Sequence, residues 1–155
     1  MVVKTKLFGE IDITDDKIIT FEQGMIGFGE LKKFAILYDL ENENKNAIRW
    51  LQSLDEPTLA FPVIDPYIVK KDYNPEVNDN SINALGEFDP EAFSVLVTIS
   101  VPKDVKKMSC NLRAPIVINA ETRKGAQIIS ETAEYPVKFQ VYEILKSKKE
   151  SKGAC

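Results

Sequence analysis

The apolar residues of this chain occur in short runs rich in β-branched side chains, and turn-forming residues separate one run from the next. Such bounded runs are typical of strands rather than of helices. The clearest is 93–101, in which polar and apolar residues alternate. A chain of 155 residues has room for one domain with a real core. This pattern therefore predicts an all-β domain, either a barrel or a sandwich.

The segments that fit the strand pattern are 7–13, 17–21, 34–38, 47–54, 59–64, 93–101, 108–112, 114–119, 125–130 and 137–144. The first two of these predict a hairpin, because only a short turn separates them. Pro62 places its strand at a sheet edge or a bulge, since proline has no N–H to donate to a neighbouring strand. A short helix is predicted over 78–85, with Asn78 as its N-terminal cap and Gly86 at its end.

Composition divides the chain into a single-domain body, 1–145, and a lysine-rich tail, 146–155. The tail holds four lysines and one glutamate, so the formal net charge of -4 averages a tail of +3 and a body of -7. A segment this polar and charged is predicted to be disordered. The tail either binds nucleic acid or only keeps the protein soluble. The second function is favoured, because the tail has no aromatic residue to stack on bases.

The acidic charge of the body is concentrated after Lys71, and no lysine or arginine follows until Lys103. The acidic residues between these two positions are Asp72, Glu76, Asp79, Glu87, Asp89 and Glu91. A surface of this sign repels phosphate backbones and attracts basic protein surfaces. For any single acid, a solvated position is the simpler interpretation. For the cluster as a whole, a binding surface and a solvated face are equally good interpretations.

The chain contains no histidine, which excludes a Ser-His-Asp or Cys-His catalytic site built from its own residues. Cys110 is either a thiolate activated by Arg113 or a small apolar strand residue, and the lack of histidine favours the second. Asp55, Glu56 and Asp65 are candidates for a carboxylate pair, but Asp55 and Asp65 each lie in a turn that contains a proline, where capping or Asx-turn bonding explains them. We therefore expect a non-enzymatic protein with no catalytic residues, metal or cofactor.

Localisation is predicted from what the sequence lacks. The first residues do not have the pattern of a signal peptide. No apolar run approaches the roughly 20 residues that cross a bilayer. The two cysteines, Cys110 and Cys155, form no motif and are best interpreted as reduced thiols. These features predict a soluble cytoplasmic protein.

Residues 22–30 contain three glycines and predict a loop, although their spacing matches neither a dinucleotide-binding nor a phosphate-binding motif. This loop is unusual because it carries Met25, Ile26 and Phe28. These apolar side chains either fold inward as a lid over one end of the domain or form an exposed contact patch. The lid is favoured, and the two arrangements are compatible in part. Trp50 is equally well interpreted as an interface anchor or as a buried strand residue.

Several motifs run through the body from about Thr5 to Val137. They are Phe8-Gly9-Glu10; Ile19-Thr20-Phe21 with Gly24 and Gly27-Phe28; Trp50-Leu51-Gln52-Ser53 with Asp55, Pro57 and Leu59-Ala60-Phe61; Val63-Ile64-Asp65-Pro66; Asn111-Leu112; Ala114-Pro115-Ile116-Val117-Ile118-Asn119; Thr122, Lys124-Gly125 and Gln127; and Tyr135-Pro136. In this order and spacing they resemble the flagellar assembly factor FliW family. The Trp-Leu-Gln-Ser and Ala-Pro-Ile-Val-Ile-Asn blocks are the most specific.

The resemblance implies a small, barrel-like antiparallel sheet with one or two short helices, in a non-enzymatic protein of the bacterial cytoplasm. Members of the family bind flagellin before export, and they bind and antagonise the translational repressor CsrA by partner exchange. No direct contact with nucleic acid or membrane is expected. The alternative is an unrelated β-barrel module that binds a small molecule or nucleic acid.

Two groups of residues are the candidates for these partners. The acidic residues Asp72, Glu76, Asp79 and Glu87 suit a basic RNA-binding protein such as CsrA. The apolar loop residues Met25, Ile26 and Phe28 suit the apolar face of a flagellin helix. Trp50 is kept as a further partner-binding candidate.

Overall fold

The computed structural model describes residues 1–38, 48–86, 90–131 and 134–153. The strands are β1 (Val2–Thr5), β2 (Gly9–Asp12), β3 (Ile19–Thr20), β4 (Lys33–Tyr38), β5 (Arg49–Ser53), β6 (Ala60–Ile64), β7 (Phe93–Ser100), β8 (Ser109–Cys110), β9 (Ile116–Asn119), β10 (Lys124–Gln127) and β11 (Phe139–Gln140). The helices are α1 (Pro66–Val69), α2 (Asp79–Asn83) and α3 (Tyr142–Gly153), with 3-10 turns η1 (Asp15–Lys17), η3 (Pro90–Ala92) and η4 (Val105–Lys107).

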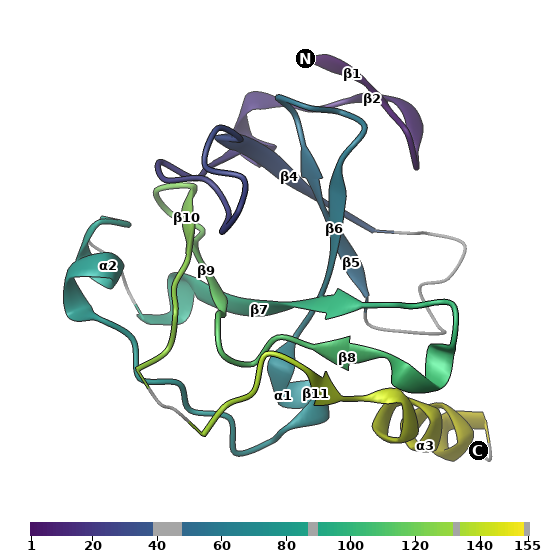
Figure 1. Ribbon diagram of the computed structural model, residues 1–155. Helices are drawn as coiled ribbons and strands as arrows, with labels where there is room; N and C mark the ends of the chain where they lie inside the picture. The colour runs from purple at the N-terminus through teal and green to yellow at the C-terminus, as the bar shows by residue number, and fades with distance from the viewer. Residues whose placement is uncertain (39–47, 87–89, 132–133, 154–155) are drawn as a thin grey trace.

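The main sheet closes on itself into a barrel. Its strands follow the order β7-β6-β5-β4-β3-β10-β9, and β9 returns to pair with β7 (Figure 1). All these pairings are antiparallel except that of β10 with β3, in which Lys124 is the partner of Thr20. The short strands β8 and β11 continue from the far half of β7. The predicted all-β, barrel-like fold is therefore confirmed.

The predicted hairpin of 7–13 with 17–21 is wrong, because β2 pairs with the N-terminal strand β1. The Thr5 hydroxyl donates to the Gly9 carbonyl and accepts from the Phe8 N–H, which holds the turn between the two strands. Val3 and Ile13 are buried against Ala35 of β4, so the β1–β2 hairpin covers the outside of the barrel. Figure 1 shows this hairpin at the top of the molecule, beyond β4 and β6.

The barrel interior is filled by large apolar side chains from every side of the closed sheet. Those that are almost fully buried include Phe21, Phe34, Leu51, Leu96 and Ile116. The Phe21 and Phe34 rings lie 5.0 Å apart between their centroids, in a tilted arrangement that favours aromatic pairs. Burial of each such side chain contributes roughly 1.5–3 kcal/mol, so this interior is the main source of stability.

A second apolar cluster lies below the barrel, between β7, β8, α1 and α3. Tyr73 is buried there and donates its hydroxyl to the Leu112 carbonyl at 2.6 Å. Ile144 and Leu145 of α3 pack against the same cluster. The tail predicted to be disordered from residue 146 is thus helical through Gly153, because α3 begins on the body and continues outward. The sequence predicted one or two helices and missed α1 and α3.

One local prediction is confirmed, and a second holds only at the position of one residue. The Asn78 side chain accepts a hydrogen bond from the Asn80 N–H at 2.7 Å and caps α2, and Gly86 follows the helix with φ at +95°. Pro62 is the partner of Trp50 in β5, while β6 pairs with β7 only through Val63 and Ile64. β6 lies between β5 and β7, so the predicted edge strand is wrong, although Pro62 itself lies outside the pairing with β7 and its missing N–H costs no hydrogen bond there.

The glycine loop, residues 22–30, turns tightly at Gly24. Gly24 has φ at +67°, and a Cβ on it would lie 2.4 Å from the Phe28 carbonyl oxygen and 2.7 Å from the Gly29 Cα. A Cβ on Gly29 would meet nothing closer than the Gln23 carbonyl oxygen at 3.7 Å. The two glycines therefore differ in what they tolerate, although they lie in the same loop.

We expect Gly24→Ala to lower the free energy of unfolding by roughly 2–5 kcal/mol. This combines the left-handed backbone penalty of about 1–2 kcal/mol with an overpacking cost of about 1–3 kcal/mol. The matched variant Gly29→Ala should change stability by less than about 1 kcal/mol. Urea denaturation followed by circular dichroism measures both values. Equal stability of the two variants would contradict the tight turn at Gly24.

Candidate partner-binding surface

A groove runs between the glycine loop, α2 and β10, and has a volume of about 340 Å³. Apolar side chains dominate its lining. Ile26 lines it from the loop, Ala84 and Leu85 from the end of α2, and Ile128 and Ile129 from the chain that follows β10. Ile26 and Ile129 are 51% and 60% exposed, so large apolar surface stays open to solvent at this groove.

Several contacts attach the glycine loop to the barrel, among them a side-chain hydrogen bond and a buried apolar residue. Gln127 accepts from the Ile26 N–H at 2.9 Å and donates to the Ala114 carbonyl at 3.3 Å. Met25 is only 3% exposed and belongs to the barrel core. Phe28 is 40% exposed, and its ring meets Phe61 edge-on at 5.1 Å. The lid and patch interpretations each hold in part, since Met25 points inward and Ile26 stays outside.

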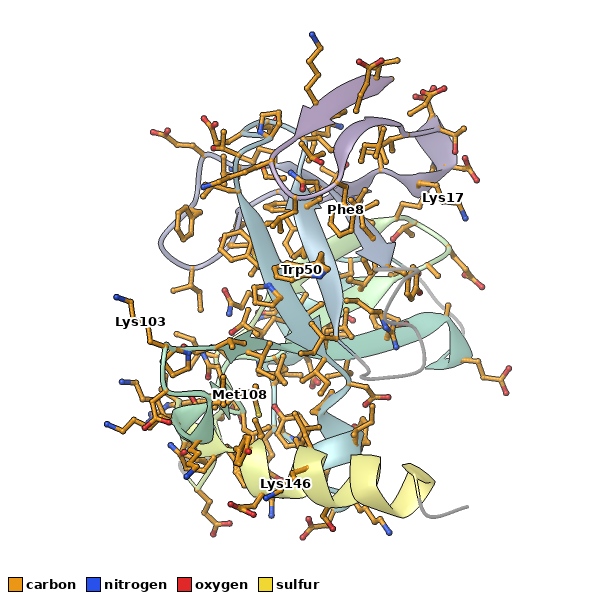
Figure 2. The ribbon with its side chains drawn as sticks, turned by 90° about the vertical axis from the view of Figure 1, so that its right-hand side faces the viewer. Phe8, Lys17, Trp50, Lys103, Met108 and Lys146 are labelled. Carbon is orange, nitrogen blue, oxygen red and sulfur yellow. The ribbon has the colours of Figure 1, made fainter. Side chains whose placement is uncertain are left out.

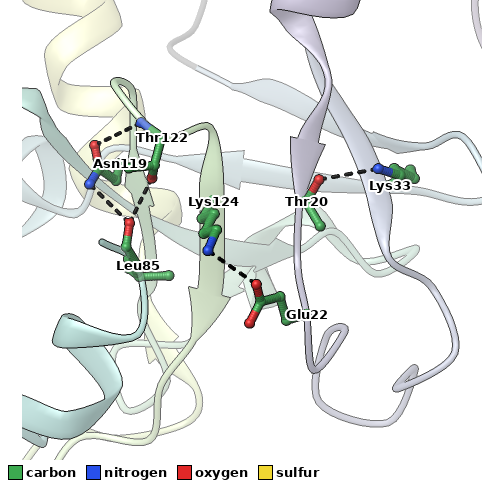
Figure 3. Close-up of polar contacts among 7 residues, drawn as sticks. All are labelled: Thr20, Glu22, Lys33, Leu85, Asn119, Thr122 and Lys124. Atoms are coloured by element: carbon green, nitrogen blue, oxygen red, sulfur yellow. Dashed lines mark hydrogen bonds and ion pairs between the residues drawn. The ribbon is translucent and has the colours of Figure 1, made fainter. Parts of the chain in front are cut away.

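The other wall of the groove, formed by α2 and its flanking residues, is fixed through hydrogen bonds to two of its backbone carbonyls. The Leu85 carbonyl accepts from the Asn119 amide at 3.1 Å and from the Thr122 hydroxyl at 2.6 Å (Figure 3). The Glu76 carbonyl accepts from the Glu131 N–H at 2.6 Å. These contacts lie on either side of α2, so the segment is fixed at both ends and its short helix lies between.

An ion pair joins the loop to β10 at the edge of the groove. The Lys124 ammonium lies 3.2 Å from Glu22, and both side chains are partly exposed (Figure 3). A pair of this kind contributes at most about 1 kcal/mol, because water screens it. Its charges matter more for which partner can approach than for stability.

The predicted acidic cluster is only partly tested by the structure, because Glu87 and Asp89 lie outside the described residues. Glu76 and Asp79 are exposed and flank Asn78, which lines the groove. Asp72 is exposed too, but it lies just past α1, 3.3 Å from the Lys70 ammonium. Neither Glu76 nor Asp79 lines the groove, but both are close in sequence to Asn78, while Asp72 forms a local ion pair with Lys70.

Trp50 is half-buried on β5, opposite Leu37 and Pro62 in the sheet register. Figure 2 shows it on the face of β5 and β6, and it is not among the groove-lining residues. Its burial lies between the two predicted extremes, so neither the interface anchor nor the buried strand residue describes it fully.

The catalytic alternatives lose their geometric basis. Cys110 is 1% exposed, and burial raises the pKa of its thiol to about 12, the opposite of nucleophile activation. Asp65 caps α1 by accepting from the Tyr67 N–H, and Asp55 accepts from the Lys32 and Lys33 N–H groups. Both aspartates thus act on backbone, although Asp55 bonds to a distant loop rather than to its own turn.

Within the described part of the chain, no group of three or more cysteine, aspartate or glutamate side chains is arranged to hold a metal ion. Across the same residues, no helix combines the length and apolarity needed to span a membrane.

Sequence reasoning missed Ile129 as an exposed site residue. A signal was present, because Ile128 and Ile129 are consecutive at the end of a strand, where successive side chains point to opposite faces. Ile128 is buried and Ile129 is exposed, as this alternation requires. Ser81, Ala84 and Leu85 were missed as groove residues because their role depends on how α2 lies on the barrel.

Comparison with known proteins agrees with this architecture. The family model described as FliW protein matches residues 2–141. Flagellar assembly factor FliW from Lachnospira eligens is 46% identical over 147 residues, which cover 94% of this chain and 97% of that protein. The corresponding factor from Lachnoclostridium phytofermentans is 45% identical, with all of both chains covered.

A solved structure gives the same result for the fold. The crystal structure of the flagellar assembly factor FliW superposes with a TM-score of 0.82 at 33% identity, and covers 91% of this chain and 96% of that one. With a family match over most of the chain, close relatives over its whole length and a shared fold, the chain belongs to the FliW family.

Proposed function

We propose that this protein binds flagellin in the cytoplasm before export and binds the repressor CsrA when flagellin is absent, so that flagellin translation resumes. Relatives of this chain carry the name flagellar assembly factor, and this supports a role in flagellar assembly. The observation that carries the proposal is the apolar groove between the glycine loop and α2.

The groove suits one face of an amphipathic helix. Such helices dock through apolar residues three or four positions apart into an apolar channel. Ile26 and Ile129 provide exposed apolar contacts on the two sides, and Leu85 and Ile128 provide a buried floor. Flagellin before assembly offers helical ends with unburied apolar faces, so we place a flagellin helix in this groove.

The acidic segment, by which we mean the part of the chain that carries Glu76 and Asp79, is the proposed contact for CsrA. An RNA-binding protein carries a basic surface, and opposite charge accelerates its approach to an acidic one. Glu76 and Asp79 are exposed, and the sequence has no lysine or arginine from 72 to 102. We therefore place the basic surface of CsrA against the outside of this segment.

The geometry of α2 supports partner exchange between these two sites. Ser81, Ala84 and Leu85 face the groove, while Asp79 is exposed on the same short segment. A helix seated in the groove and a protein seated on the acidic side would thus contact one element from both sides. Simultaneous occupancy is disfavoured because α2 has only five residues between these two surfaces.

We expect Ile26→Asp and Ile129→Asp each to weaken flagellin binding at least about tenfold, because each introduces a charge where the partner's apolar face must be desolvated. Isothermal titration calorimetry with monomeric flagellin measures the change. Val101→Asp is the matched control, since Val101 is 50% exposed but does not line the groove. Equal losses in all three variants, or no loss at either isoleucine, would reject the groove as the flagellin site.

The double variant Glu76→Lys with Asp79→Lys should slow association with CsrA by about tenfold at low salt, and the difference should shrink as salt rises. Stopped-flow or surface plasmon resonance at several salt concentrations measures this. The control variant Glu10→Lys with Asp12→Lys makes the same charge change on exposed positions of β2. If the two variants associate at the same rate at every salt concentration, the assignment of Glu76 and Asp79 to the CsrA contact is wrong.

A further inference from the structure

The end of the molecule around η4 and α3 collects lysines from separate parts of the sequence. The Val141 N–H donates to the Met108 carbonyl at 3.1 Å, and α3 packs against η4 directly after this bond. Met108 and Leu145 share the lower apolar cluster. The lysine-rich helix is therefore docked beside the lysines of η4. Figure 2 shows Lys103, Met108 and Lys146 in the same lower part of the molecule, away from Lys17 and the β1–β2 hairpin.

We define the basic end as residues 103–107 and 138–147. These two segments hold five lysines and two acidic residues, a net charge of +3 in a chain of -4. The lysines whose side chains are described are all exposed: Lys103, Lys106, Lys107, Lys138 and Lys146. The Asp104 carboxylate accepts from the Lys106 N–H, and so serves as a cap of η4. Basic charge therefore dominates this surface.

An aromatic ring holds the lysine of the first turns of α3 in place. The Lys146 ammonium lies 6.0 Å from the Tyr142 ring centroid, a cation–π distance. Figure 1 places α2 at the left of the molecule and α3 at the lower right, so the basic end is separated from Asp79, the first residue of α2.

The chemistry of the basic end favours binding to a nucleic-acid backbone over binding to a membrane surface. A helix that binds a membrane surface needs an apolar face to insert. Ile144 and Leu145 are already packed against the body, and α3 has no large apolar residue after Leu145. Lysines arranged along a helix and a neighbouring turn match instead the repeated charges of a nucleic-acid backbone. No aromatic residue follows Tyr142, so contacts to bases are not provided.

We propose that the basic end is a sequence-independent contact for the phosphates of single-stranded RNA. This inference rests on the proposed function. The basic end would bind the messenger RNA to which CsrA is bound, while the acidic segment would bind CsrA itself. This proposal differs from two expectations based on the sequence: that the tail only keeps the protein soluble, and that the protein makes no direct contact with nucleic acid. The packing of α3 on η4 adds Lys106 and Lys107 and turns a short tail into a surface.

Fluorescence anisotropy with a labelled single-stranded RNA of about 20 nucleotides tests the proposal, using the full chain at several salt concentrations. The wild type should bind with a Kd of roughly 1–100 µM at low salt, whatever the RNA sequence. The triple variant Lys106→Gln, Lys107→Gln and Lys146→Gln should bind at least about tenfold more weakly. Its plot of log affinity against log salt should be less steep by about 2, since three phosphate contacts are lost.

The matched control is Lys4→Gln, Lys6→Gln and Lys17→Gln, which removes the same charge from exposed positions at the other end. Its affinity should stay within about twofold of the wild type. Absence of RNA binding by the wild type at low salt, or equal losses in the two triple variants, overturns the proposal. So does displacement of the RNA by polyglutamate at equal charge concentration, which would indicate an acidic protein, or stronger binding to phosphatidylglycerol vesicles.

Calorimetry with CsrA and with flagellin, in the absence of RNA, separates this proposal from the proposed function. The triple variant should bind both proteins as the wild type does, because its lysines lie away from the groove and the acidic segment. If the wild type binds RNA but neither protein, the proposed function fails and the RNA contact stands. Loss of protein binding in the triple variant alone would overturn the assignment of these lysines to RNA.

Discussion

The pairing of β9 with both β10 and β7 is the constraint on which the rest of the structure depends. It turns a long meander into a closed barrel, so that every barrel strand has a neighbour on each side. Closure encloses the interior, where Phe21, Leu96 and Ile116 come together from distant parts of the chain. Without it, β10 and part of β7 would be open sheet edges with unpaired backbone groups, which promote aggregation.

The same closing strands carry the polar side chains that shape the outer surface. Asn119 ends β9, Thr122 lies in the following turn, and Gln127 ends β10. The first two hold the Leu85 carbonyl behind α2, and the third holds the glycine loop through the Ile26 N–H. The groove between loop and helix is therefore set by the position of β9 and β10. Its two walls come from different parts of the sequence, but both are hydrogen-bonded to residues of β9, β10 and the turn between them.

The features that the sequence predicted well are those decided within a few residues. Asn78 caps α2 because its side chain reaches an N–H two positions away, and Pro62 lies away from a second strand because it lacks an N–H. The failures depend on distant contacts. Nothing in 7–21 indicates that β2 pairs with residues before it, and the helix in the tail depends on Ile144 and Leu145 packing against the lower apolar cluster. The glycine loop falls between the two cases, since its exposed Ile26 and buried Met25 are both apolar.

Charge follows the same division between local and distant effects. The acidic segment is continuous in sequence, so its sign could be read directly, whereas its position beside the groove comes from the carbonyl contacts of Glu76 and Leu85. The basic end exists only in three dimensions, because two segments more than thirty residues apart contribute its lysines. A protein that carries opposite charges on opposite sides can attract a basic protein on one and a phosphate backbone on the other. The net charge of -4 hides this arrangement, and the packing of α3 on η4 produces it.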